Sequence, residues 1–263
     1  MTTTIALAGK GGTGKTTVAA MVIKYLTLNQ EDAILAIDAD PSANLHMVLG
    51  LELGWTVGGI REDLLKKIKE SVAVGGAAVG SVAGGMSKHD YLNYEIYSAL
   101  VESERFDLIA MGRSEGPGCY CGVNHNLRQI MDTLSENYKY VVVDNEAGME
   151  HLSRRTTNDV EYLFVVSDPT QRGIIAAERI AKLKDELEIH IENTYLILNR
   201  LPGEIPPALQ ERIDDIGIPF LGVVPADDTL TTFEFSGKPI IELSLDSPVY
   251  QAVAEMMDKT LNL

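Results

Sequence analysis

The residues from Gly9 to Thr17 read GKGGTGKTT and directly follow a short apolar run, IALA. The spacing, a glycine, four residues and then Gly-Lys-Thr, is that of a phosphate-binding loop. Its glycines let the backbone fold around phosphate oxygens, so that successive N–H groups point at the negative charge. A helix that begins at the end of the loop turns the positive end of its dipole to the same anion. The pattern therefore predicts a strand, a phosphate-binding turn and a helix.

Each position of this loop has an expected task in holding ATP and Mg²⁺. Lys15 is expected to reach the β- and γ-phosphates and to serve catalysis there, and the Thr16 hydroxyl is expected to bind magnesium. A glycine-rich turn that binds nothing is the alternative, but the strand and helix patterns around the loop are the context that the motif requires. The other expected contacts with the nucleotide come from Gly9, Gly11, Gly12, Thr13, Gly14 and Thr17.

Apolar runs of strand length alternate with helical patterns along the whole chain. Strands are predicted over residues 3–8, 33–38, 106–111, 140–144, 162–166, 194–198 and 220–224. Helices are predicted over residues 16–26, 61–72, 126–137, 172–188, 206–216 and 248–261. This alternation indicates a doubly wound α/β fold with a mostly parallel sheet covered on both faces. Because no linker or repeat interrupts it, we expect one domain over residues 1–263, with ligands at the carboxyl ends of the strands.

The charge balance narrows the classes of partner. The chain has 22 basic and 38 acidic residues, a formal net charge of −16, which disfavours a nucleic-acid surface built from clustered cations. No apolar stretch reaches the roughly 20 residues needed to cross a bilayer. The glycine-rich segment 72–85 comes closest, and no role is assigned to it. With no signal sequence recognised, we expect a cytoplasmic protein that binds neither nucleic acid nor membrane.

Acidic residues follow two of the predicted strands. Asp38 ends the strand 33–38 and Asp40 follows it, while Asp144 ends the strand 140–144. An acid at such a position can orient water or hold magnesium through water, so Asp38 and Asp144 are candidates for the magnesium site. The alternative for Asp38 and Asp40 is that they cap the next turn.

Both cysteines of the chain lie in one short loop sequence, GPGCYCG, as Cys119 and Cys121. A disulfide between them would close a very small strained ring, whereas two thiols at this spacing favour a soft metal. Two thiolates cannot fill a four-coordinate site, but the same pair from each subunit of a symmetric dimer can. The alternative is that both thiols pack as small hydrophobic groups.

The phosphate-binding loop has a second lysine, Lys10, and in this it resembles the deviant loop of the MinD/ParA class of ATPases. The resemblance implies that Lys10 contacts the phosphates of the partner subunit in an ATP-bound homodimer; a solvated loop lysine is the alternative. The run IDADP resembles the first switch of this class, which implies that Asp40 positions the attacking water and Asp38 supports the magnesium ion. DNEAG resembles the second switch, in which Gly148 would sense the γ-phosphate.

The same resemblance extends to the adenine site. In this class an asparagine after one late strand and a proline loop after the next hold the adenine, which implies such roles for Asn199, Arg200 and Pro225. Asparagine and proline are also common turn residues, and that alternative stays open.

Three segments together, the loop with Lys10, MGRSEGPGCYCGVN and DNEAGMEHLSRR, are similar to the CooC-type ATPases. That family matures nickel in carbon monoxide dehydrogenase, and a close relative serves acetyl-CoA synthase. The resemblance implies ATP hydrolysis by a homodimer, coupled to delivery of nickel into one of these apo-enzymes. The alternatives are an iron–sulfur carrier or reductase of the nitrogenase iron protein type, a MinD/ParA-like positioning ATPase, and a dimer with purely structural zinc.

Overall fold

The computed structural model describes residues 2–73, 87–113, 121–148, 159–183 and 190–261. Eight strands in these segments form one sheet in the order β3-β4-β2-β5-β1-β6-β7-β8. All neighbouring strands are parallel except β3 and β4, which are antiparallel. The doubly wound, mostly parallel α/β fold expected from the sequence is confirmed.

All seven predicted strands are present, and the eighth is the short edge strand β3. A two-residue strand is too short for a recognisable apolar pattern, which is why β3 was not predicted. The strands are β1 (Thr3–Ala8), β2 (Ile34–Asp38), β3 (Val101–Glu102), β4 (Asp107–Ala110), β5 (Tyr140–Asp144), β6 (Val160–Ser167), β7 (Ile191–Leu201) and β8 (Phe220–Pro225).

The six predicted helices correspond to α1 (Lys15–Asn29), α3 (Val57–Ala73), α5 (Cys121–Ser135), α7 (Gln171–Leu183), α8 (Pro207–Asp214) and α10 (Pro248–Leu261). The last predicted residues of the helix 172–188 lie outside the described part of the chain. Three α-helices and one 3₁₀ turn were not predicted: α2 (Leu45–Val48), α4 (Lys88–Ser98), α9 (Asp228–Ser236) and η2 (Ile240–Glu242).

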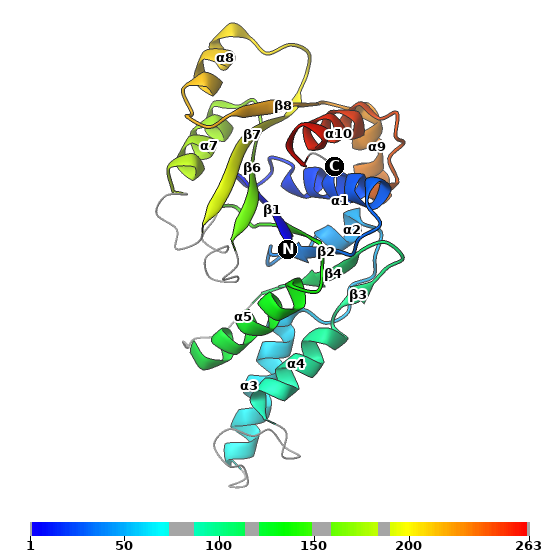
Figure 1. The fold of residues 1–263 in the computed structure, drawn as a ribbon, viewed down its shortest axis with the longest axis vertical. Coiled ribbons are helices and arrows are strands. Elements are labelled where there is room, and N and C mark those ends of the chain that lie inside the picture. The colour runs from blue at the N-terminus through cyan, green and yellow to red at the C-terminus, as the bar shows by residue number, and fades with distance from the viewer. Residues whose placement is uncertain (1, 74–86, 114–120, 149–158, 184–189, 262–263) are drawn as a thin grey trace.

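The helices cover both faces of the sheet (Figure 1). On one face α1, α2, α9 and α10 pack against alternate strand residues such as Ile5 and Leu7 of β1. On the other face α3, α4, α5, α7 and α8 pack against the residues between them, such as Ala6 and Ala8. These four residues of β1 are all fully buried, so both faces of the strand are apolar and its sequence is a continuous apolar run.

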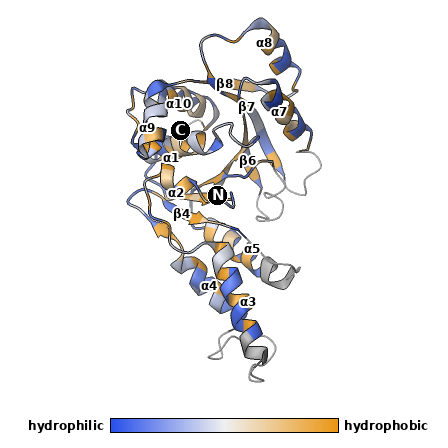
Figure 2. Cartoon of the chain, turned by 180° about the vertical axis from the view of Figure 1, so that it is seen from behind, coloured by the Kyte–Doolittle hydropathy of each residue, from blue (hydrophilic) through white to orange (hydrophobic). Residues whose placement is uncertain are grey.

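Helices α3 and α4 run side by side and extend away from the sheet (Figure 1). The hydroxyl of Tyr91 on α4 donates to a carboxylate oxygen of Asp63 on α3 and accepts from Lys67, both at 2.7 Å. Figure 2 shows hydrophobic and hydrophilic residues mixed along α3, as expected for a helix with one buried face. The glycine-rich segment joins these two helices and lies mostly outside the described residues. Within those residues, no helix is long and apolar enough to span a bilayer.

The parallel register brings the carboxyl ends of the central strands to one edge of the sheet. Asp38 at the end of β2 is paired with Asp144 at the end of β5, and Asp144 is paired in turn with Leu7 of β1. On its other side Asp38 is paired with Ala110, the last residue of β4. The phosphate-binding loop, both switch segments and the chain that leads to the cysteines therefore leave the sheet at the same edge.

Candidate functional site: a nucleotide cavity at the carboxyl edge

The loop between β1 and α1 has the closed shape that its glycines were expected to allow. Both the backbone N–H and the hydroxyl of Thr13 donate to the carbonyl oxygen of Lys10, at 3.3 and 2.9 Å. Gly14, at a φ of +86°, sits directly before the first residue of α1. A side chain on Gly9 would place its Cβ 2.2 Å from the carbonyl oxygen of Val166 on β6. The loop is therefore fixed by backbone contacts that only glycine permits at these positions.

Lys15 is a buried cation at the centre of this loop. Its side chain is only 7% exposed, and Nζ donates to the carbonyl oxygen of Lys10 at 3.3 Å. Burial lowers the pKa of the ammonium group, and the carboxylates of Asp144, Asp40 and Glu146 oppose that shift. An ammonium group held in a poorly solvated site next to the loop backbone suits the binding of a phosphate chain.

Thr16 and Asp144 bring two side-chain oxygen donors of the kind that magnesium takes next to each other. The Thr16 hydroxyl donates to one carboxylate oxygen of Asp144 at 2.6 Å. The other carboxylate oxygen of Asp144 is buried and has no hydrogen-bond partner among the described residues. Magnesium usually takes one or two protein oxygens and completes its shell with water and phosphate. The donor set therefore fits Mg²⁺ bound with a nucleotide, and in the described part of the chain no cluster of His, Cys, Asp or Glu side chains would hold a metal alone.

The carboxylate of Asp38, by contrast, binds backbone N–H groups of the first switch. One of its carboxylate oxygens accepts from the backbone N–H of Asp40 at 3.1 Å, and the other accepts from that of Leu45 at 2.8 Å. Asp40 itself accepts from the backbone N–H of Ser42 at 2.8 Å and lines the cavity. Asp38 therefore shapes the segment that carries Asp40, and a contact between Asp38 and magnesium stays a prediction.

The burial of Asp144 gives a testable pH dependence of stability. Burial raises its pKa from 3.8 to about 7, so the folded protein without metal holds this proton more tightly than the unfolded chain does. Its contribution therefore lowers the free energy of unfolding as pH rises from about 4 to about 7. We expect Asp144→Asn to raise that free energy at pH 8 by roughly 1–3 kcal/mol, and by less at pH 5, because it removes an uncompensated buried charge.

Urea unfolding of both proteins in EDTA at the two pH values measures this difference. Magnesium-dependent ATP hydrolysis should fall in the same variant, since the metal loses a carboxylate. A wild-type protein that is more stable than Asp144→Asn at pH 8 without metal would contradict the assignment.

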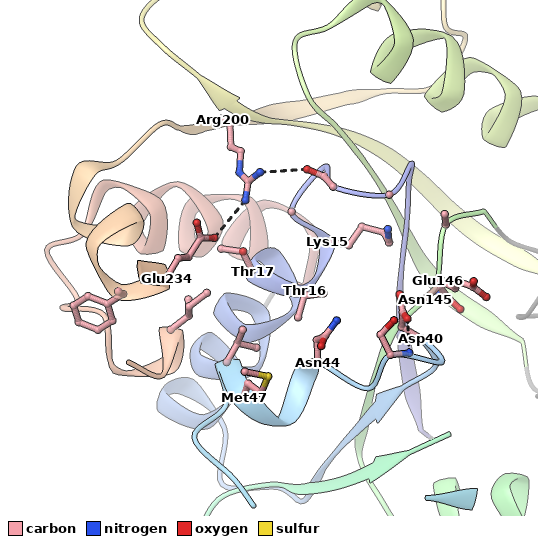
Figure 3. A pocket seen from close by; sticks show the side chains of 18 of the residues that line it. Lys15, Thr16, Thr17, Asp40, Asn44, Met47, Asn145, Glu146, Arg200 and Glu234 are labelled. Atoms are coloured by element: carbon pink, nitrogen blue, oxygen red, sulfur yellow. Dashed lines mark hydrogen bonds and ion pairs between the residues drawn. The ribbon is translucent and has the colours of Figure 1, made fainter. Parts of the chain in front are cut away.

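A cavity of about 630 Å³ extends from the phosphate-binding loop along α1. Figure 3 shows Lys15, Asp40, Asn145 and Glu146 at one end of it and Arg200 with Glu234 at the other. Apolar side chains that were not predicted also line the cavity, from α2, α9 and η2: Met47, Val48, Phe233 and Ile240. These come from distant parts of the sequence and follow no motif, so only the fold reveals them. The cavity thus offers charged groups for phosphates and apolar groups for a base.

The residues predicted to hold adenine differ in their placement. Asn199 is buried, and its side-chain amide donates to the carbonyl oxygen of Thr13 at 2.8 Å. Arg200 lines the cavity and donates to the carbonyl oxygen of Gly12 at 3.2 Å. Pro225 ends β8 and is not among the described residues that line the cavity. Asn199 and Arg200 therefore brace the phosphate-binding loop from β7, and adenine contacts by all three remain predictions.

The side chain of Lys10 is exposed, and it does not line the cavity of its own subunit. This placement agrees with a lysine that acts elsewhere than on its own nucleotide. Of the two cysteines, Cys119 lies outside the described residues, and Cys121 begins α5 with only its backbone described. The predicted metal site across a dimer is thus not tested by the described geometry.

The chain that leads to the cysteines is tied to the first switch. Met111, directly after β4, donates its backbone N–H to the carbonyl oxygen of Asp38 at 2.7 Å and accepts from the N–H of Gly58 at 2.8 Å. A Cβ on Gly58 would lie 2.0 Å from the carbonyl oxygen of Arg113, so the start of α3 packs closely on this segment. A Cβ on Gly112 would lie 2.4 Å from the side-chain oxygen of Thr56, and the chain's single tryptophan, Trp55, directly precedes Thr56 and is 62% exposed.

The fold and the cavity define a nucleotide-binding protein with a phosphate-binding loop, and comparison with known proteins gives its family. The chain belongs to the CobQ/CobB/MinD/ParA nucleotide binding domain family, whose model matches residues 4–240. An uncharacterized ATP-binding protein of Methanocaldococcus jannaschii is 40% identical to it over 98% of both chains. The chain is therefore an ATPase of the MinD/ParA type, as the loop sequence predicted.

Two further comparisons bear on the function and the fold. The carbon monoxide dehydrogenase accessory protein CooC of Rhodospirillum rubrum is 28% identical, over 91% of this chain and 90% of its own. The septum site-determining protein MinD of Pyrococcus horikoshii, solved with Mg-ADP, superposes with a TM-score of 0.66 at 22% identity, covering 98% of this chain and 96% of that one. The second likeness shows the fold alone.

Proposed function

We propose that this ATPase acts as a homodimeric metallochaperone that hydrolyses ATP to insert nickel into carbon monoxide dehydrogenase or the related acetyl-CoA synthase. The similarity to CooC over nine-tenths of both chains supports this choice of client. The Cys-x-Cys sequence, with both of the chain's cysteines, supplies soft ligands for the metal. The observation that carries the proposal is the direct connection between the first switch and the segment that leads to these cysteines.

That connection runs through the backbone at the end of β2. Asp38 holds the N–H groups of Asp40 and Leu45 with its carboxylate, and its carbonyl oxygen accepts from Met111. A rearrangement of the first switch on loss of the γ-phosphate would therefore move Met111, which directly follows β4 and lies eight residues before Cys119. The nucleotide site and the metal site share one structural element, the end of β2 at Asp38. Through this element ATP hydrolysis changes the affinity for the metal.

The dimer completes both the nickel site and the nucleotide site. Four thiolates from two copies of Cys119 and Cys121 would enclose one nickel ion near the two-fold axis. The exposed Lys10 would reach the phosphates of the partner's ATP, while Lys15 and Thr16 bind the phosphates and the metal within their own subunit. Magnesium, when bound, neutralises charge on the β- and γ-phosphates. Asp40 orients the attacking water.

Reconstitution with a purified apo-enzyme tests the proposal. Apo-carbon monoxide dehydrogenase, or apo-acetyl-CoA synthase in parallel, is incubated anaerobically with limiting nickel, ATP and this protein, and client activity is followed with time. We expect activation that needs ATP and is lost in both Lys15→Ala and Cys119→Ser/Cys121→Ser. Activation that is equally fast without ATP, or with the serine variant, would contradict it.

Two simple observations separate the alternatives. A brown anaerobic preparation with visible absorption would favour an iron–sulfur carrier or reductase, since four thiolates on a dimer axis also suit a cluster. ATP-dependent sedimentation with DNA or liposomes would favour a positioning ATPase. The net charge of −16 makes us expect no sedimentation with either.

A further inference from the structure

We propose that Asn145 is a second catalytic acceptor in this ATPase: its side-chain oxygen holds one O–H of the attacking water, while Asp40 holds the other. The inference rests on the ATP hydrolysis of the family and on the role predicted for Asp40, and it does not depend on the identity of the metal or the client. Asn145 directly follows Asp144 at the end of β5 and lines the cavity.

The orientation of the Asn145 amide is fixed by β1. The residue is 2% exposed, and its Nδ2 donates to the carbonyl oxygen of Leu7 at 2.9 Å. The backbone N–H of Asn145 donates to the same carbonyl oxygen at 3.3 Å. Turning the amide over would set its oxygen against the oxygen of Leu7, so the nitrogen and oxygen positions are unambiguous.

The side-chain oxygen of Asn145 is left as a buried acceptor. It has no hydrogen-bond partner among the described residues. A buried carbonyl oxygen of this kind is normally satisfied by a donor, so the bound state of the site must supply one. The phosphate oxygens of ATP are acceptors and cannot do so. Lys15 donates to the carbonyl of Lys10 and is expected on the phosphates when ATP is present. The partner's Lys10 is likewise expected on the phosphates, so water is the donor that we assign to this oxygen.

Asn145 also lies on the side of β5 away from the expected magnesium ion. Asp144 turns towards the hydroxyl of Thr16, whereas Asn145 turns towards Leu7 of β1, as successive residues of an extended chain do. Figure 3 shows Asn145 at the same end of the cavity as Asp40 and Glu146. Asn145 and Asp40 thus line the same cavity, and the described hydrogen bond of the Asn145 side chain goes to Leu7 rather than to Thr16 or Asp144.

Two acceptors are what the attacking water requires. To present a lone pair to the γ-phosphorus, the water must point both O–H bonds away from it, and two fixed acceptors hold that orientation. The water oxygen bonds to phosphorus, the bond to the bridging oxygen breaks, and its electron pair leaves on ADP. The proton of the water passes through the Asp40 carboxylate to the released phosphate. Asn145 takes no proton and holds the second O–H in place.

Steady-state and single-turnover hydrolysis by Asn145→Ala, with no nickel or client present, tests the inference. We expect kcat to fall roughly 10- to 100-fold with the affinities for ATP and ADP and the magnesium dependence little changed, because the variant removes a contact with the water and none with the nucleotide or the metal; the hydrogen bond to Leu7 is lost as well. The double variant with Asp40→Ala should lose far less than the product of the two single losses, since residues that act on one water are non-additive.

A matched control comes from β7. The amide of Asn193 donates to the carbonyl oxygen of Glu161 at 3.2 Å, the same kind of contact between neighbouring strands but outside the cavity. Asn193→Ala should therefore leave kcat unchanged. A kcat for Asn145→Ala within about twofold of wild type, or a loss matched by weaker ATP binding and lower thermal stability, would overturn the inference. Because the readout is hydrolysis alone, failure of nickel delivery would leave it standing.

Discussion

Replacing Lys15 by alanine should reduce the rate of ATP hydrolysis by roughly 10²- to 10³-fold or more. Lys15 is 7% exposed and lies in a poorly solvated pocket, where the attraction of its ammonium group for phosphate charge is much stronger than in water. No neighbouring cation replaces it in the described part of the cavity wall near Asp40 and Glu146. The γ-phosphate would then face the carboxylates of Asp144, Asp40 and Glu146 without the cation of its own loop, leaving magnesium and the partner's Lys10 to offset its charge.

The measurement is phosphate release at saturating ATP, together with the ATP dissociation constant. Lys182→Ala is a suitable control, because Lys182 is exposed on α7 and paired only with Glu178 at 2.5 Å. It should hydrolyse ATP at the wild-type rate. Hydrolysis by Lys15→Ala within tenfold of wild type would show that this lysine does not bind the phosphates.

Mixing two inactive variants, Lys10→Ala and Asp40→Ala, should restore ATP hydrolysis. If Lys10 acts on the nucleotide of the partner subunit, a mixed dimer has one complete site: the Asp40 of the first protein meets the Lys10 of the second. With random exchange, half of the dimers are mixed and half of their sites are complete, so about a quarter of the wild-type rate is expected. The exposure of Lys10 and its absence from the lining of its own cavity lead to this expectation.

The control is a mixture of Lys15→Ala with Asp40→Ala. Both residues belong to the same subunit's site, so every site in that mixture lacks one of them and no activity should return. If the mixture containing Lys10→Ala also stays inactive while dimers still form with ATP, Lys10 acts within its own subunit and the shared-site arrangement is wrong.

The phosphate-binding loop was predictable from the sequence because its requirements are local. Gly9 and Gly14 stand where a side chain would meet Val166 or Asn199 at 2.2 Å, so glycine at these positions signals the loop directly. The inner strands were equally predictable, because burial on both faces makes strands such as β1 and β5 continuous apolar runs.

The parts that were not predicted depend on contacts between distant segments. Helix α4 presents only Tyr91, Leu92 and Ile96 to the core, and its tyrosines and asparagine have modest helix propensity, so its pattern is weak. The apolar cavity wall joins Met47 of α2 to Phe233 of α9, nearly two hundred residues apart. No periodicity or motif in the sequence predicts that these two residues line the same cavity.

The acceptor role of Asn145 illustrates the same limit. The sequence DNEAG placed this residue in a switch, but its amide could have pointed anywhere. The hydrogen bond to Leu7 on the neighbouring strand fixes the orientation of this amide and leaves its oxygen without a hydrogen-bond partner among the described residues. The pairing of Asp38 with Met111, which ties the first switch to the cysteine segment, is likewise a product of strand order.

Anaerobic nickel titration of the purified protein, with and without ATP, tests the central claim most directly. Wild type is compared with Cys119→Ala/Cys121→Ala, and the fluorescence of Trp55 offers a second signal, because this residue directly precedes Thr56, which packs against Gly112 in the segment that leads to the cysteines. We predict one tightly bound nickel ion per dimer that needs both cysteines and whose affinity changes with ATP. Nickel binding that ignores the cysteines, or that ATP leaves unchanged, would contradict coupling between hydrolysis and metal delivery.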